Sequence, residues 1–134
     1  MIYMLDTNIC IYIIKNNPLS YFERFELLSV TNIIAISSIV LSELQYGVEC
    51  SNKKQQSQTN LDLLASKLKI LPYTNACAIH YGVIKSFLKA QGQLIGGNDL
   101  LIAAHAIAEK AVLITNNTKE FLRVPGLQVE NWAK

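Results

Sequence analysis

The chain has 134 residues and a mass of 15.0 kDa, is 51% hydrophobic, and carries a formal net charge of +2. This length suits one domain over residues 1–134, and the hydrophobic content excludes an intrinsically disordered protein. No apolar run reaches the roughly 18 residues of a membrane span, and the first residues lack the basic region of a signal peptide. Three cysteines without a C-x-x-C pair indicate free thiols, so we expect a cytoplasmic protein with no membrane partner.

Strand-like and helix-like segments alternate along the chain. Strands are predicted at residues 2–5, 33–37, near 70–71, at 111–115 and at 127–131. Three of them are nearly continuous apolar runs, which are typical of strands covered on both faces. Helical spacing of apolar residues predicts helices at 8–16, 38–49, 53–69, 75–92 and 98–110. This alternation predicts an α/β fold with three α/β/α layers and a central parallel sheet of four or five strands.

An acidic residue follows directly after the first predicted strand, in the stretch YMLDTN. Ligands of open parallel sheets bind beside the carboxyl ends of the strands, which makes Asp6 a candidate site residue. Aspartate is also a favourable N-cap for the helix predicted to begin near Asn8. The residue by itself fits both roles equally.

Glu43 is predicted to lie on an apolar helix face. Its neighbours at helical spacing are Ile39, Val40 and Tyr46. An unpaired buried glutamate is rare, so this position favours a functional carboxylate. The alternative is that the helix phase drifts and leaves the side chain at the boundary with solvent.

Asp99 stands at the head of the stretch NDLLIAAHAIA, which is apolar on every side. Such a helix is predicted to be buried at the centre of the domain, with Asn98 as its N-cap and its N-terminus open to the same crevice. Ile102, Ala103 and Ala106 share the face of the carboxylate. The structural alternative is an acid that the helix dipole stabilises in the first turn.

Three carboxylates in one crevice need a counter-charge. Oxygen ligands without His or Cys suit Mg²⁺ or Mn²⁺, and such clusters serve phosphodiester cleavage, in which the metal polarises the phosphate and activates water. We therefore expect Asp6, Glu43 and Asp99 to be both metal ligands and catalytic residues. After the fourth strand, Asn117-x-x-Glu120 fits either a capping box or support for this metal site.

The stretches YMLDTN, SSIVLSEL with YGVE, IGGNDLLIAAHA and VLITNNTKEF occur in this order over nearly the whole chain. Together they resemble the PIN-domain ribonucleases, specifically the VapC-type toxins of toxin–antitoxin modules. The resemblance implies an acidic Mg²⁺ or Mn²⁺ site at the three carboxylates named above, with supporting roles for Thr7, Asn8 and Thr115. Many PIN domains carry a fourth acid where this chain has Asn117, so Glu120 is the nearest substitute.

The resemblance also implies partners. Toxins of this type cut structured RNA, often at one site in a tRNA or a ribosomal RNA. They form homodimers, and a cognate VapB-type antitoxin inhibits them by placing its C-terminal segment in the active-site groove.

The distribution of charge is compatible with an RNA substrate. Setting four site acids aside leaves six acidic residues against twelve Lys and Arg, an excess that attracts phosphates. Each basic residue by itself is more typical of an ordinary solvated side chain. The candidate RNA-binding residues are Lys53, Lys54, Lys85, Lys89, Lys119 and Arg123.

His80 and His105 lie in apolar helices without a second histidine at ligand spacing, which favours core or interface positions over catalysis. We therefore expect water, not a ribose 2′-hydroxyl, to attack the phosphate. Two alternatives stay open: a catalytically degenerate PIN scaffold that binds RNA or protein, and another Mg-dependent phosphoesterase. A haloacid-dehalogenase-type phosphatase would require D-x-D, where this chain has Asp6-Thr7-Asn8.

Overall fold

The computed structural model describes residues 1–133, and its five strands form one parallel sheet in the order β3-β2-β1-β4-β5. The strands are β1 (Ile2–Leu5), β2 (Ile33–Ser37), β3 (Lys69–Leu71), β4 (Val112–Ile114) and β5 (Gln128–Glu130). Helices flank the sheet, so the predicted α/β class with a central parallel sheet is confirmed.

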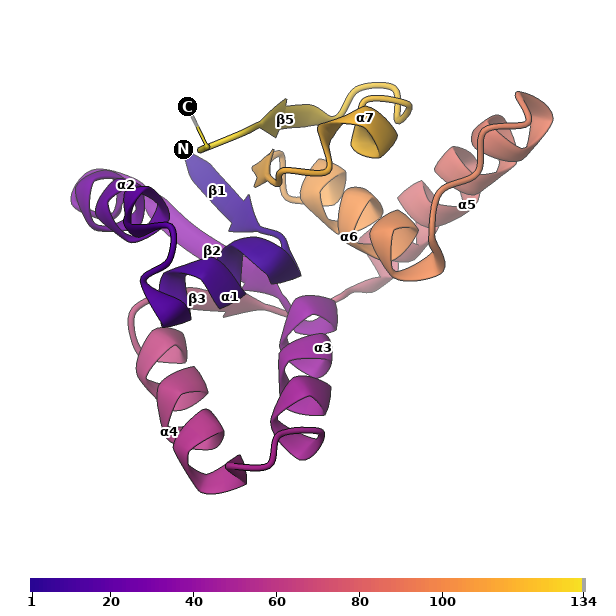
Figure 1. Ribbon diagram of the computed structural model, residues 1–134. Helices are drawn as coiled ribbons and strands as arrows, with labels where there is room; N and C mark the ends of the chain where they lie inside the picture. The colour runs from indigo at the N-terminus through magenta and orange to yellow at the C-terminus, as the bar shows by residue number, and fades with distance from the viewer. Residues whose placement is uncertain (134) are drawn as a thin grey trace.

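Seven helices connect these strands within residues 1–133. They are α1 (Thr7–Lys15), α2 (Leu19–Ser29), α3 (Ser38–Glu49), α4 (Lys54–Ala65), α5 (Asn75–Ala90), α6 (Gly97–Ala108) and α7 (Thr118–Phe121). Figure 1 shows α5 and α6 together at one side of the molecule, α1 and α2 at the other, and α3 and α4 extending away from the strands. None of the helices in the described part of the chain is both long and apolar enough to cross a bilayer.

The apolar runs of β1 and β4 form the centre of the core. Met4, Leu5, Leu113 and Ile114 are at most 1% exposed, because helices cover both faces of the sheet here. Helix α6 is almost as deeply buried, as its composition predicts. Its buried residues are Leu100, Ile102, Ala103, Ala104, His105 and Ala106.

The start of α6 differs from the prediction. The helix begins at Gly97 with Gly96 as its N-cap, and the Gly96 carbonyl accepts the Leu100 N–H at 2.9 Å. Asn98, the predicted N-cap, therefore lies inside the first turn. The hydrogen bond to the Gly96 carbonyl places the N-cap at residue 96, two residues before the Asn98 position that side-chain capping preference predicts.

Helix α2 was not predicted from the sequence. It begins after Pro18, and its buried residues Tyr21 and Phe25 are one helical turn apart. That spacing is typical of a helix, but most other residues of this segment are polar or exposed and hide the pattern. The helix predicted at 53–69 ends at Ala65, because Lys69 already pairs with β2 as part of β3.

The strand order places a topological switch point beside β1. The chain passes from β1 to β2 and β3 on one side and later crosses to β4 and β5 on the other. Such a switch point leaves open space at the carboxyl ends of the two strands involved. Asp6 follows β1 there and Thr115 follows β4, and the Asp6 N–H donates to the Ile114 carbonyl at 2.9 Å.

Candidate active site

The carboxylate of Asp6 is held by two hydrogen bonds at the switch point. Its Oδ1 accepts the Thr7 backbone N–H, which makes Asp6 the N-cap of α1, and its Oδ2 accepts the Thr115 hydroxyl, both at 2.8 Å. The side chain is only 7% exposed, and this burial raises the pKa of Asp6 while the two hydrogen bonds act to lower it. The capping role and the place at the strand edge therefore coexist.

Glu43 reaches the same region from α3. Its Oε1 accepts the Thr7 hydroxyl at 3.0 Å, across 36 residues of sequence. Thr7 thus contacts one acid with its backbone and another with its side chain. Glu43 is partly buried beside the buried Val40, whereas Tyr46 is 72% exposed. The glutamate consequently lies at the border between core and solvent, as the alternative sequence interpretation described.

Asp99 lies half-buried in the first turn of α6, as predicted. Burial and, after it, the negative charges of Asp6, Glu120 and Glu43 together raise the pKa of Asp99 to about 6. Like charges shift a pKa in this way only when they lie close together. The fold therefore brings three other carboxyl groups near Asp99 at the switch point.

Glu120 joins the group through α7. Asn117 donates its side-chain amide to Glu120 Oε2 at 3.2 Å, and its backbone N–H to the Thr115 hydroxyl at 3.0 Å. The capping box considered for this pair is not formed, because Asn117 makes no side-chain capping bond. The amide orients the carboxyl instead, while Asn8 lies exposed in the first turn of α1.

The donor chemistry of this cluster fits a hard divalent cation. All four acids offer carboxylate oxygens, the ligands that Mg²⁺ and Mn²⁺ prefer. Within residues 1–133, no three His, Cys, Asp or Glu side chains stand arranged to hold one ion together. Mg²⁺ commonly binds through one or two carboxylates and keeps several waters, so this arrangement is compatible with it.

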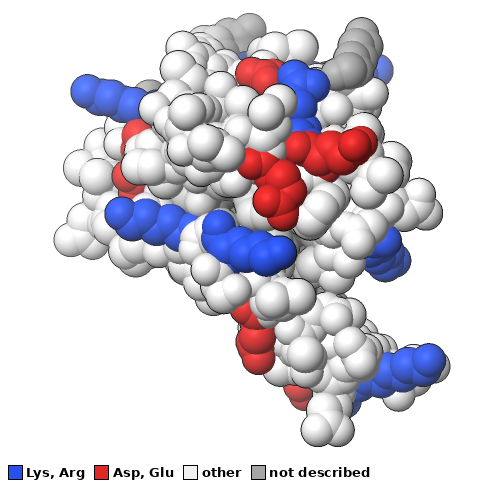
Figure 2. Space-filling view, turned by 90° about the vertical axis from the view of Figure 1, so that its left-hand side faces the viewer, with Lys and Arg blue, Asp and Glu red and all other residues white. Residues whose placement is uncertain are grey.

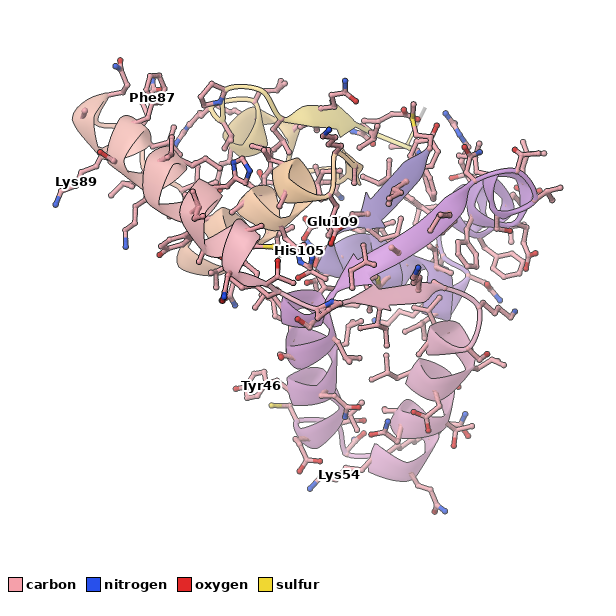
Figure 3. The ribbon with its side chains drawn as sticks, turned by 180° about the vertical axis from the view of Figure 1, so that it is seen from behind. Tyr46, Lys54, Phe87, Lys89, His105 and Glu109 are labelled. Atoms are coloured by element: carbon pink, nitrogen blue, oxygen red, sulfur yellow. The ribbon has the colours of Figure 1, made fainter. Side chains whose placement is uncertain are left out.

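The predicted RNA-binding residues are spread over the molecule. Figure 3 shows Lys54 at the end of the α3–α4 pair and Lys89 towards the end of α5. Lys119 lies in α7 beside Glu120, and Arg123 follows that helix and donates to the Leu94 carbonyl at 3.3 Å. On the face shown in Figure 2, basic and acidic side chains are interspersed. The structure therefore does not bring the six residues into one patch.

Two contacts near the acids were missing from the sequence prediction. The Asn116 amide donates to the Tyr12 hydroxyl at 3.1 Å, across 104 residues, and ties the β4–α7 loop to α1. His105 bonds Ser37 across 68 residues. No local signal could reveal either pair, because each forms only when distant elements pack. His105 is fully buried, in agreement with the predicted core position.

An α/β domain that gathers carboxyl groups at the carboxyl edge of a parallel sheet is typical of nucleases that use divalent metal ions. The sequence profile of the PIN domain matches residues 3–127. The chain belongs to the PIN-domain family and, within it, to the VapC proteins.

Three relatives define this relationship. Ribonuclease VapC2 of Rickettsia felis is 57% identical over 134 residues, which cover both chains completely. The tRNA(fMet)-specific endonuclease VapC of Shigella flexneri is 43% identical over 131 residues, 98% of each chain. The crystal structure of VapBC2 from Rickettsia felis, bound to a DNA fragment from their promoter, is 56% identical with a TM-score of 0.95, covering 98% of this chain and 99% of that one.

Proposed function

We propose that this protein is a toxin of a toxin–antitoxin pair, an endoribonuclease that cleaves tRNA or ribosomal RNA with a divalent metal ion. Asp6, Glu43 and Asp99 are its proposed metal ligands and catalytic residues. The observation that carries the proposal is that Thr7 bonds both Asp6 and Glu43 at the switch point of the sheet, with Asp99 close enough for their charges to raise its pKa. Relatives that match 98% to 100% of the chain are named ribonuclease or tRNA(fMet)-specific endonuclease, which supports it.

The chain's own residues position the acids. A bound Mg²⁺ or Mn²⁺ would polarise the scissile phosphate and activate the attacking water. Thr7 and Thr115 orient the carboxylates of Glu43 and Asp6, and each carboxylate oxygen keeps a second lone pair for coordination. Asn117 orients Glu120, the proposed substitute for a fourth acid. Asn8, which is exposed next to Thr7, is proposed as a further polar support.

Water is the proposed nucleophile, so cleavage leaves a 5′-phosphate and needs no 2′,3′-cyclic intermediate. A 2′-deoxy substitution at the cut site should therefore leave cleavage intact. Initiator tRNA is the first substrate to test, because two relatives at 43% and 42% identity are named tRNA(fMet)-specific endonucleases. An enzyme with these substrates would act in the cytoplasm.

The proposed protein partner is a VapB-type antitoxin, because several solved structures similar to this chain are VapBC pairs. We also propose a homodimer. Helix α5 exposes Ile79, Val83 and Phe87 at successive helical turns, with exposed fractions of 70%, 66% and 45%. Apolar side chains exposed in a row at this spacing are typical of a protein–protein interface.

The test is cleavage of purified tRNA and ribosomal RNA by antitoxin-free protein with Mg²⁺, Mn²⁺ or EDTA. The variants are Asp99→Asn and, as a matched control, Glu23→Gln, which removes one exposed carboxylate from α2. We expect discrete cuts with wild type and Glu23→Gln only in the presence of metal. Asp99→Asn should be slower by about 100-fold or more.

The same proteins distinguish the degenerate scaffold. A scaffold without activity would show no cleavage, and titration with Mn²⁺ would give the same result for wild type and Asp99→Asn. Cleavage that resists EDTA, or that survives in Asp99→Asn, would contradict the proposed site.

A further inference from the structure

A buried hydrogen bond joins the two helices that carry Asp99 and Glu43. His105 of α6 and Ser37, the N-cap of α3, are both 0% exposed, and His105 Nδ1 lies 2.7 Å from Ser37 Oγ. Figure 3 shows His105 where α6 passes the start of α3. Neither residue was assigned a role in the site described above.

Further contacts hold both residues of this hydrogen bond in place. Ser37 is the last residue of β2, and its hydroxyl oxygen also accepts the Ile39 N–H at 3.0 Å. The Tyr73 ring packs edge-on against the His105 ring, with centroids 5.7 Å apart, and the Tyr73 N–H donates to Ser38 Oγ at 3.0 Å. The imidazole is therefore held between the sheet edge and the β3–α5 connection.

The buried residues next to His105 on α6 are small, whereas Leu100 and Ile102 are the larger buried side chains earlier in the helix. Ala103, Ala104 and Ala106 are all fully buried. Alanine presents no long side chain to interlock with a neighbouring helix, so around His105 the packing resists sliding along the helix axis less than it does at Leu100 and Ile102. A hydrogen bond weakens steeply with distance and angle, so the bond to Ser37 fixes the axial position of α6 at this point more closely than its alanines do.

The bond lies at a similar distance along the chain from both acids. Asp99 precedes His105 by six residues in α6, and Glu43 follows Ser37 by six residues into α3, roughly 9 Å along a helix in each case. Because a helix moves nearly as a rigid body, a displacement of α6 relative to α3 at this bond changes the distance between the Asp99 and Glu43 carboxylates. Sites of this kind tolerate displacements of only about 0.5 Å.

We propose that His105, through its hydrogen bond to Ser37, is a positioning residue that sets the separation of Asp99 and Glu43 for metal binding. This inference rests on the proposed function. It assigns to His105 no contact with metal or RNA; the residue acts only through the placement of α6.

Two substitutions of His105 distinguish the contributions of its two ring nitrogens. The side-chain amide of asparagine places a polar atom near the position of Nδ1, whereas that of glutamine reaches the position of Nε2. Nε2 faces Glu109 Oε2 at 3.4 Å, on the side of the ring away from Ser37. His105→Asn therefore keeps a partner for Ser37, and His105→Gln removes it.

The experiment is calorimetric titration of the metal-free full chain with Mn²⁺, together with kcat and KM for tRNA cleavage. We expect His105→Gln to bind Mn²⁺ about tenfold more weakly and to lose kcat while KM stays unchanged. His105→Asn should stay within about threefold of wild type. Ser37→Ala and Ser37→Thr form a second pair, in which Ala weakens Mn²⁺ binding and Thr restores it.

Phe25→Leu controls for a general loss of stability, because Phe25 is a buried residue of α2 outside α3 and α6. It should lower the melting temperature and leave Mn²⁺ affinity unchanged. Equal affinities of wild type and His105→Gln, or equal losses in His105→Gln, His105→Asn and Phe25→Leu, would overturn the inference. Absence of Mn²⁺ binding by the wild type would instead overturn the proposed function, and the inference with it.

Discussion

Single residues at the switch point serve several partners at once. The Asp6 carboxylate caps α1 and also accepts the Thr115 hydroxyl, while Thr7 contacts both Asp6 and Glu43. The N-terminus of a helix favours negative charge, so the capping role helps to keep Asp6 ionised despite its burial. Structural and functional interpretations of such a residue are therefore not exclusive.

Thr115 allows the first residue-scale prediction. Thr115→Val keeps the shape of this fully buried side chain but removes the donor to Asp6. The pKa of Asp6 should rise further, because burial would then act with less opposition. We expect Mn²⁺ affinity to fall about tenfold in calorimetric titration, with Thr115→Ser close to wild type. Equal affinity in Thr115→Val and Thr115→Ser would show that the hydroxyl has no such role.

Asp99 allows a second residue-scale prediction, which concerns the stability of the metal-free protein. In the folded, metal-free protein the pKa of Asp99 is about 6, above its usual value of 3.8, so the proton is bound more tightly than in the unfolded chain. The stability from this group is fully present below about pH 4 and is lost as the pH rises through about 6.

Asp99→Asn should therefore stabilise the metal-free protein at pH 8 by about 1 kcal/mol, a modest value because the carboxyl is partly exposed to solvent. In EDTA we expect its melting temperature to exceed that of wild type by about 3 °C at pH 8, and by less at pH 4.5. Excess Mg²⁺ should reverse the order, since only wild type gains stability from binding. A difference in melting temperature between Asp99→Asn and wild type that does not change with pH would contradict the clustering of acids.

At the scale of elements, the exposed face of α5 makes the proposed dimer testable. Val83→Glu places a charge in the middle of the apolar row formed with Ile79 and Phe87. We expect a molar mass near that of one chain in light scattering after size exclusion, where wild type shows two. Lys85→Glu, exposed on the same helix outside the row, should remain dimeric. Two chains in both variants would place the interface elsewhere.

Element types followed from the sequence more reliably than element ends. The continuous apolar runs of β1, β2 and β4 predicted covered strands, because only burial on both faces suits such runs. The limits of α4 and α6 depended instead on a strand pairing at Lys69 and a backbone bond at Gly96. Helix α2 was missed because only Tyr21 and Phe25 carry its buried face.

At the scale of the whole molecule, the excess of basic residues is dispersed, which predicts a diffuse contribution to RNA affinity. In the Asp99→Asn background, Lys54→Ala and Lys89→Ala should each weaken tRNA binding only a few-fold. Each should also lower the slope of affinity against salt concentration by about one. Fluorescence anisotropy at several salt concentrations measures both quantities. A loss confined to one RNA sequence would indicate base recognition instead of phosphate contact.

The sequence by itself determined the class of fold and the order of the strands along the chain and named three candidate acids, because burial patterns and residue types are local properties. Glu120, Thr7 and Thr115 were candidates already, but only the tertiary structure decided which partners they meet. The bond between Ser37 and His105 was not foreseen at all. These contacts join residues from separate elements. Their geometry arises when the helices pack against the sheet, and no local spacing encodes it.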